Sequence, residues 1–209
     1  MNRDGRPGGG HTRPGREPRP YRLQARAAAA AETGRRILGA MQALFVERPY
    51  PQITLVEVAA RAGVTLQTVL RRFGTKEGLL AAAAEEGRTR ILAQRGEAPA
   101  GDPAGAVRNL FDHYEEFAPI VLRLLEQETQ LPQIAALTRA GRRTHAAWVE
   151  RVFAPWLLRR RGQLRRSLRA QLIALGDVCF WKILRRDLGL SRREAERALL
   201  ELIQAALGR

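Results

Sequence analysis

The chain has 209 residues, enough for one or two domains with a buried core. Its formal net charge at pH 7 is +15 and comes almost wholly from arginine, since Lys76 and Lys182 are the only lysines. This balance favours an anionic partner such as a nucleic acid. Cys179 is the only cysteine, which excludes an intramolecular disulfide and a cysteine-cluster metal site and fits a cytoplasmic protein. We expect no transmembrane helix and no secretory signal, because no long uncharged apolar run is present.

Residues 1–24 are predicted to form a disordered basic arm, because they are rich in Gly, Pro and Arg and show no apolar period. Two interpretations stay open. The arm is either a solvated tail or a DNA-contacting segment that adds phosphate contacts or enters the minor groove. Its contacts would then be Arg13, Arg16, Arg19 and Arg22.

Residues 25–48 are predicted to be helical, with Ile37, Met41, Leu44 and Phe45 as the inward stripe. Pro49 and Pro51 end this helix, because proline cannot donate a backbone hydrogen bond and restricts the residue before it.

Two short helices follow over residues 54–73. Thr54 and Glu57 have the spacing of a capping box, in which each side chain satisfies a backbone N–H of the helix start. Gly63 can take the left-handed conformation that ends a helix, and Thr65 is the N-cap of a second helix over residues 66–73. Two short helices joined by a tight glycine turn predict a helix-turn-helix.

The outward positions of the second helix favour contact with DNA. A recognition helix approaches base edges near its N-terminal end, here Thr65 to Thr68, and Arg71 and Arg72 can reach phosphates. No acidic residue lies between Glu57 and Glu77. The alternative is an ordinary helical hairpin whose polar face is merely solvated.

Residues 33–80 resemble the N-terminal domain of the TetR family of transcriptional regulators. The matching elements are Phe45 to Tyr50, Thr54 to Ala59, Ala62-Gly63-Val64-Thr65, Arg72-Phe73 and Thr75-Lys76-Glu77.

The resemblance implies that Thr65, Thr68 and Arg72 contact DNA, and that Lys76 holds a phosphate at the start of the fourth helix. The family usually has tyrosine where Leu70 stands, and often a polar residue where Leu66 stands. These leucines would contact thymine methyl groups or turn into the core, and both orientations stay open. The full predicted set of DNA-contacting residues is Thr54, Thr65, Leu66, Gln67, Thr68, Leu70, Arg71, Arg72 and Lys76.

Beyond a DNA-binding domain at residues 25–74, residues 75–209 are predicted to form a helical effector-binding and dimerisation domain. Residues 75–95 form the connecting helix, and a Gly/Pro-rich break follows. Further helices are expected at 105–117, 119–128, 133–152, 163–188 and 192–207, the last capped by Ser191 and Glu194. The fold class is therefore all-α, because no alternating apolar run predicts a strand.

The last two helices carry apolar residues on more than one side, which predicts a second surface covering them. A symmetry copy would supply it as a four-helix interface, and the resemblance to the TetR family implies such a dimer. A monomer that buries both sides internally is the alternative. The predicted interface residues are Val178, Trp181, Leu184, Leu199 and Ile203.

The resemblance also implies a cavity for a small, apolar effector among the middle helices. Its candidate lining residues are His113, Tyr114, Phe117, Leu124, Trp148, Val152, Trp156 and Phe180, although aromatic residues at helical spacing also form ordinary cores.

We predict no enzyme and no cofactor, because no Gly-rich phosphate loop and no metal-ligand or nucleophile pattern is present. The predicted function is a ligand-responsive, sequence-specific DNA-binding regulator, a repressor that acts as a homodimer on a palindromic operator. The alternative is a helical ligand-binding or scaffolding dimer whose helix-turn-helix does not read DNA.

Overall fold

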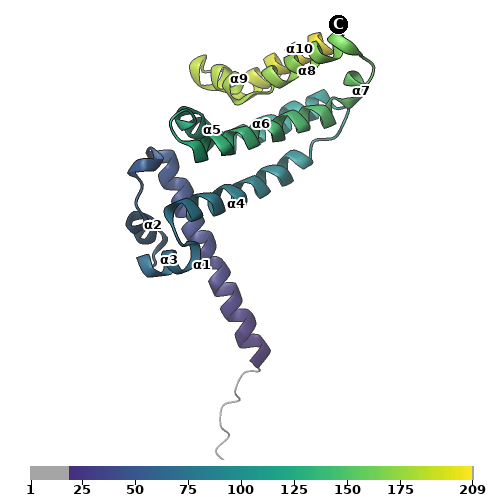
Figure 1. The fold of residues 1–209 in the computed structure, drawn as a ribbon. Coiled ribbons are helices and arrows are strands. Elements are labelled where there is room, and N and C mark those ends of the chain that lie inside the picture. The colour runs from purple at the N-terminus through teal and green to yellow at the C-terminus, as the bar shows by residue number, and fades with distance from the viewer. Residues whose placement is uncertain (1–18, 209) are drawn as a thin grey trace, which may run out of the picture.

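The computed structural model describes residues 19–208, in which it has helices and no strand, so the predicted all-α fold is confirmed. Figure 1 shows a long α1 with two short helices, α2 and α3, beside it, and α4 leading away from them. Helices α5 and α6 form the next layer, and α8 to α10 lie outermost. The bounds are α1 Arg19–Glu47, η1 Tyr50–Gln52, α2 Leu55–Ala62, α3 Leu66–Phe73, α4 Lys76–Gly96, α5 Pro103–Gln127, α6 Pro132–Val152, α7 Ala154–Leu157, α8 Gly162–Leu175, α9 Val178–Lys182, η2 Ile183–Asp187 and α10 Arg192–Gly208.

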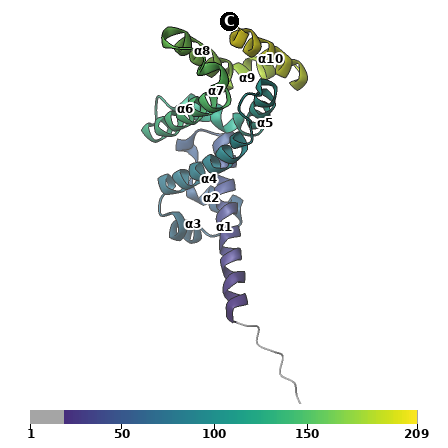
Figure 2. The same cartoon turned by 90° about the vertical axis from the view of Figure 1, so that its right-hand side faces the viewer.

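Helix α1 begins at Arg19, six residues before the predicted start, so residues 19–24 are helical and not a disordered arm. Residues 1–18 of the predicted arm lie outside the described residues. Residues 24–32 are all exposed, and burial begins at Gly34. Figures 1 and 2 show this half of α1 projecting past α2 and α3 without a neighbouring element. Its five consecutive alanines explain why it is helical without tertiary packing, because alanine has the highest helix propensity.

The helix-turn-helix forms through the local signals that predicted it. Glu57 N donates to the Thr54 hydroxyl at 3.3 Å, and Thr54 N donates to the Glu57 carboxylate at 2.9 Å. Gly63 has φ 63°, which is the left-handed conformation that ends α2. The Thr65 hydroxyl accepts from Thr68 N at 3.2 Å and caps α3. The capping box, the glycine turn and the second cap are therefore confirmed.

An apolar N-terminal cluster joins α1, α2, α3 and the start of α4. It is built around Ile37, Phe45, Val58, Val69 and Leu79, each at most 2 % exposed. Ile134 of α6 is fully buried in the same cluster. Ile120 and Leu124 of α5 and Leu137 of α6 pack against it as well, so the short helices are held by α1 and α4 and meet α5 and α6 through the same cluster.

A separate C-terminal cluster joins α5 to α10. Its fully buried members include Phe111, Val149, Val152, Leu157 and Ala195. Helices α8 and α10 run antiparallel, since Arg160, two residues before α8 begins, donates to the carbonyl of Leu207 near the end of α10 at 3.0 Å.

Two predicted helix boundaries in this region were wrong. The structure has one helix, α5, where we expected two, and Pro119 lies inside it because neighbouring helices cover both of its halves. The predicted helix at 163–188 is interrupted at Gly176 and Asp177, and the Asp177 carboxylate caps α9 by accepting from Cys179 N at 2.8 Å. Asp177 is half-buried and serves as this cap.

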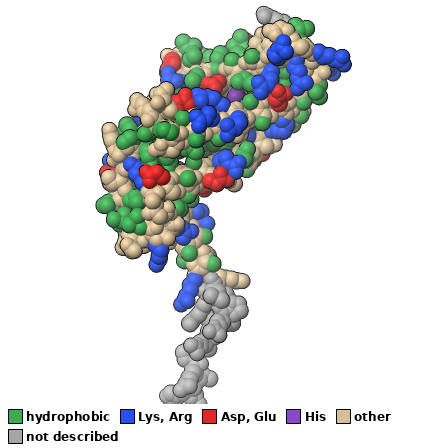
Figure 3. All heavy atoms as spheres, in the orientation of Figure 1, with side chains coloured by type: hydrophobic (Ala, Val, Ile, Leu, Met, Phe, Trp, Pro, Cys, Tyr) green, Lys and Arg blue, Asp and Glu red, His purple; other side chains and the backbone are tan. Residues whose placement is uncertain are grey.

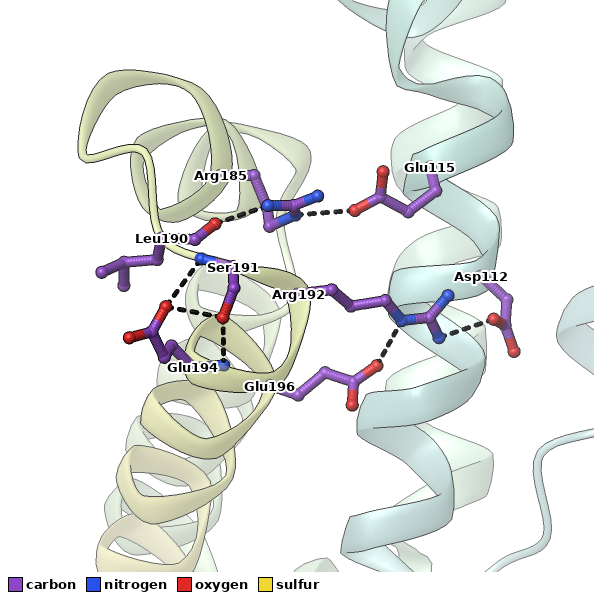
Figure 4. Close-up of polar contacts among 8 residues, drawn as sticks. All are labelled: Asp112, Glu115, Arg185, Leu190, Ser191, Arg192, Glu194 and Glu196. Carbon is purple, nitrogen blue, oxygen red and sulfur yellow. Dashed lines mark hydrogen bonds and ion pairs between the residues drawn. The ribbon is translucent and has the colours of Figure 1, made fainter.

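Polar contacts fix the start of α10 against α5 (Figure 4). Arg185 pairs with Glu115 at 2.7 Å, and Arg192 pairs with Asp112 at 2.6 Å. The Ser191–Glu194 capping box forms as predicted, with Ser191 N donating to Glu194 at 2.8 Å. These contacts set the direction in which α10 crosses α5.

The predicted dimer residues face inward. Val178, Trp181, Leu184, Leu199 and Ile203 are each at most 7 % exposed and pack within the C-terminal cluster. Their apolar surface is therefore covered within the subunit, and their part in a dimer interface stays a prediction. Within residues 163–208, the large apolar residues that are exposed are Leu164, Ile183, Leu188 and Leu202. No helix in the described part of the chain has the length and apolar character to cross a membrane.

Candidate functional site

The outward face of α3 collects most of the predicted DNA-contacting residues. Thr65, Gln67, Arg71 and Arg72 are exposed, and Thr68 is half-buried, with its hydroxyl 3.0 Å from that of Thr65. Only Val69 of α3 is buried. The helix therefore presents nearly its whole length to solvent while one side chain and the half-buried Phe73 hold it to the core.

Leu66 and Leu70 are 38 % and 36 % exposed, which excludes the orientation into the core, and their contact with thymine methyl groups stays a prediction. Both side chains lie on the solvent side of α3, not in the N-terminal cluster. An exposed leucine pair one turn apart can contact thymine methyl groups, as a buried pair could not.

The arginines of this region fall into two groups. Arg48 pairs with Glu57 at 2.8 Å, and Arg61 pairs with Glu47 at 2.6 Å, so their charges are locally balanced. Arg71 and Arg72 form no ion pair with any described residue. Their charges are the ones that α3 can offer to phosphates.

The position of the Arg72 side chain depends on Gly34 of α1, which has no side chain of its own. Its guanidinium lies so close to Gly34 that a β-carbon there would be 2.5 Å from Nη2. The guanidinium carbon also lies 5.9 Å from the centre of the Phe73 ring. Gly34 therefore lets Arg72 cross α1 at close range.

Lys76 is the first residue of α4. Its Nζ donates to the Pro51 carbonyl at 3.2 Å and lies 4.3 Å from the centre of the Tyr50 ring. Partial burial lowers the pKa of Lys76. Thr54 is exposed, but its hydroxyl is occupied by Glu57, whose pKa is lowered by these hydrogen bonds. DNA contacts by Lys76 and Thr54 stay predictions.

Three of the predicted ligand-binding residues form one aromatic group with Trp181. His113 lies 4.9 Å from Tyr114 and 5.2 Å from Phe117, and Tyr114 lies 6.0 Å from Trp181, measured between ring centres. Trp148, Val152, Trp156 and Phe180 belong to or pack against the same C-terminal cluster. Leu124 does not join them, because it packs against the N-terminal cluster.

An open groove of about 420 Å³ lies between α4 and α6. Trp148 is its only lining residue from the predicted set; the other lining residues include Leu92, Arg95, Arg143 and Thr144. The sequence did not indicate Arg95, because an arginine near the end of a polar connecting helix looks like a surface residue. The described residues contain no cluster of three or more His, Cys, Asp or Glu side chains suited to a metal ion.

The two clusters are connected by a buried hydrogen bond that the sequence did not predict. Gln127, near the end of α5, is 6 % exposed and accepts from Tyr50 N at 2.8 Å through its side-chain carbonyl. The Tyr50 hydroxyl in turn lies 3.4 Å from Glu77, and burial raises the pKa of Tyr50 to about 12. No local signal marks this contact, because its partners are 77 residues apart.

Known proteins share the sequence pattern and the fold described above. Residues 37–83 match the model of the bacterial regulatory proteins of the tetR family. A transcriptional regulator from Rhodococcus sp. Rha1 has a TM-score of 0.66 at 23 % identity, covering 84 % of this chain and 96 % of its own. A protein described as a putative TetR-family transcriptional regulator from Mesorhizobium loti MAFF303099 has a TM-score of 0.62 at 19 % identity. The match covers 86 % of this chain and 96 % of that protein.

A transcriptional regulator from Aquifex aeolicus VF5 has a TM-score of 0.59 at 17 % identity, covering 83 % of this chain and 98 % of its own. No curated protein sequence matches the chain. The match over residues 37–83 covers α2, α3 and their supports, and the structural similarity extends over the C-terminal helices. The family consists of regulators and not of enzymes. Residues 37–83 thus match the tetR family of bacterial regulatory proteins, and the helices that follow share the fold of solved transcriptional regulators.

Proposed function

We propose that the chain is a ligand-responsive repressor that binds a palindromic operator as a homodimer. The observation that carries this proposal is the face of α3, where Arg71 and Arg72 have no acidic partner among the described residues and Leu66 and Leu70 are exposed. In a helix-turn-helix dimer, the two recognition helices enter successive major grooves about 34 Å apart. A target on chromosomal DNA also implies a cytoplasmic protein.

Binding to the DNA upstream of the chain's own gene, measured across a salt series, tests this proposal. An Arg71→Ala/Arg72→Ala variant should lose sequence-selective binding. It should also show a shallower salt dependence, by a slope of about 0.9 for each phosphate contact removed. The matched control is Arg139→Ala/Arg166→Ala, which removes the same charge from the exposed surfaces of α6 and α8.

Equal loss of binding in both variants would show that net charge, and not α3, holds the DNA. Equal, weak binding to every DNA by the unmodified protein would favour the alternative of a scaffolding dimer that does not read sequence.

The dimer we propose uses the outer surface of α8 and α10. Leu164 on α8 is 66 % exposed and Leu202 on α10 is 45 % exposed, which is costly in water and favours a covering copy. Sedimentation of a Leu164→Glu/Leu202→Glu variant should give a monomer where the unmodified protein gives a dimer. A dimer of unchanged stability would place the interface elsewhere.

The effector site we propose lies among the C-terminal helices, where Trp148 borders the α4–α6 groove. Helix α4 joins this groove to the DNA-binding unit, because Arg95 lies near its end and Lys76 at its start. An effector can favour release of DNA only if it binds the released conformation more tightly than the DNA-bound one.

A further inference from the structure

Arg95 is a buried cation without an anionic partner. It lies near the end of α4 and is only 5 % exposed. Its guanidinium carbon lies 4.6 Å from the centre of the Trp148 ring and 5.4 Å from that of Tyr114. Of its nitrogens, Nη2 reaches the Tyr114 hydroxyl at 3.4 Å, and Nη1 has no hydrogen-bond partner. A buried guanidinium stays charged and is costly unless an anion or several acceptors balance it.

A neighbouring arginine shows how such a side chain is normally satisfied. Arg151 of α6 donates to the carbonyls of Ala98 and Arg95, each at 2.7 Å. It thereby holds the end of α4 in place beside the groove. Both terminal nitrogens of Arg151 thus donate to backbone carbonyls, whereas Nη1 of Arg95 has no acceptor.

The side chains around Arg95 add further polar atoms without partners. Trp148 Nε1, Trp181 Nε1 and one nitrogen each of His113 and His145 are buried and unpaired. Burial and the nearby Arg95 lower the pKa of both histidines, that of His113 to about 2. Their rings are therefore neutral at pH 7. Arg95 is the formal positive charge at the centre of this group, and no carboxylate pairs with it within the described residues.

The α4–α6 groove borders this group through Arg95 and Trp148, which line it. Its volume of about 420 Å³ falls within the range of small-molecule sites. Leu92, Ala147 and the Trp148 ring supply apolar walls, and Arg143 and Thr144 stand at the α6 side. Figure 3 shows basic side chains gathered over α6 on the face drawn there. A ligand entering here meets positive charge first and an apolar wall beside it.

We propose that this groove binds a small organic carboxylate, with its anionic end on Arg95 and its apolar body against Trp148 and Leu92. This assignment rests on the proposed ligand response and replaces the wholly apolar effector that the sequence suggested. The guanidinium matches a carboxylate in two parallel hydrogen bonds, and the burial of Arg95 strengthens them.

Thermal shift and calorimetry on the full chain without DNA test the proposal. The probes are benzoate, phenylacetate and 4-phenylbutyrate, each beside its uncharged amide. At least one carboxylate should raise Tm saturably and bind about tenfold or more tighter than its amide, a difference of about 1.4 kcal/mol. Carboxylates that bind no better than their amides would overturn the proposal.

Three variants separate the role of Arg95 from general charge. Arg95→Met should abolish the preference for the carboxylate, Arg95→Lys should keep part of it, and Arg139→Met, on the exposed surface of α6, should leave it unchanged. Ligand-free Arg95→Met should unfold at the same Tm or higher, because it removes an unpaired buried charge. A Tm well below that of the unmodified protein, or carboxylate binding that survives in Arg95→Met, would overturn the assignment.

A final arm adds the tightest carboxylate to the protein–DNA complex. Release of DNA would link the site to the proposed function. Binding without release would leave the anion site standing and would count against the ligand response.

Discussion

The N-terminal unit and the C-terminal helices are built on different cores. The N-terminal cluster contains only apolar side chains and Tyr50, whereas all five buried polar or charged side chains of the described residues lie in α4, α5 and α6, from Arg95 onward. Every buried side-chain atom without a hydrogen-bond partner also lies after residue 93. The DNA-binding unit is therefore a platform with an apolar core, whereas the unpaired buried polar groups lie in the helices that follow it, where the proposed ligand would bind.

The largest expected effect is on the platform. Phe45 is 2 % exposed at the centre of the N-terminal cluster. Phe45→Ala should lower the free energy of unfolding by about 3–5 kcal/mol, because it removes a large side chain and leaves a cavity. Urea denaturation followed by circular dichroism measures this. Phe117→Ala, at a 7 % exposed position that the His113 ring and the Arg90 guanidinium also cover, is the comparison and should cost less. An equal or larger loss at Phe117 would break the contrast between the two cores.

The second prediction concerns the loss of stability at acidic pH. His113 has a pKa lowered to about 2 by burial, by Arg95 and by His145. The folded side chain stays neutral while the unfolded chain binds a proton below its usual pKa of 6.5, so acid favours unfolding. Stability should therefore fall by up to about 1.4 kcal/mol per pH unit as the pH drops below about 6.5. Urea unfolding at several pH values should show a shallower slope for His113→Leu than for the unmodified chain. Equal slopes of stability against pH in the two proteins would mean that folded His113 binds a proton as readily as the unfolded chain does.

The third prediction tests local capping on the platform. The Thr65 hydroxyl caps α3 by accepting from Thr68 N. Thr65→Ala should lower the free energy of unfolding by about 1 kcal/mol, and Thr65→Asn, which keeps a capping oxygen, should restore most of it. Thermal unfolding measures both variants. Weak DNA binding by a fully stable Thr65→Asn protein would give the Thr65 hydroxyl a role in recognition as well.

The smallest stability effect is expected at Gly34. Alanine there should strengthen α1 by up to about 1 kcal/mol, because glycine is a poor helix former. Its methyl group would displace the Arg72 guanidinium, which is the end of a flexible side chain. Gly34→Ala should therefore be at least as stable yet bind DNA less tightly, by less than about tenfold. Gly39→Ala, where a β-carbon meets nothing within 4 Å, is the matched control. Unchanged DNA binding in Gly34→Ala would show that the position of Arg72 on α1 has no part in recognition.

The contrast also explains what the sequence could predict. The platform is specified by neighbours in the chain: Thr54 and Glu57 are three residues apart, and Gly63 and Thr65 act on adjacent backbone groups. Such signals are visible in a single sequence, and the helix-turn-helix was predicted with its caps. The orientation of Leu66 and Leu70 was not, because one-turn spacing fits either face of a short helix.

The C-terminal helices depend on contacts between distant residues. Pro119 reads as a helix break, but the packing of both halves of α5 keeps the helix continuous. The apolar residues of α9 and α10 suggested a subunit interface, but α5 and α8 already cover one side of them. The burial of Arg95 follows from Tyr114 and Trp148, which lie 19 and 53 positions further along the chain. Spacing within one segment carries no signal for such an arrangement.

The hydrogen bond from Tyr50 N to Gln127 can be tested by mutation in a genetic screen. Its donor belongs to the DNA-binding unit and its acceptor to α5, and both are buried. Gln127→Leu changes neither the outward face of α3 nor the lining of the α4–α6 groove. It removes the acceptor that holds the DNA-binding unit in position against α5. Under the proposed function as a ligand-responsive repressor, such an allele should be non-inducible in a reporter strain: it should repress its target as well as the parent does and no longer respond to the inducer. Suppressors that restore induction should map to the far side of the same contact, around Tyr50 and Glu77, rather than to either binding surface.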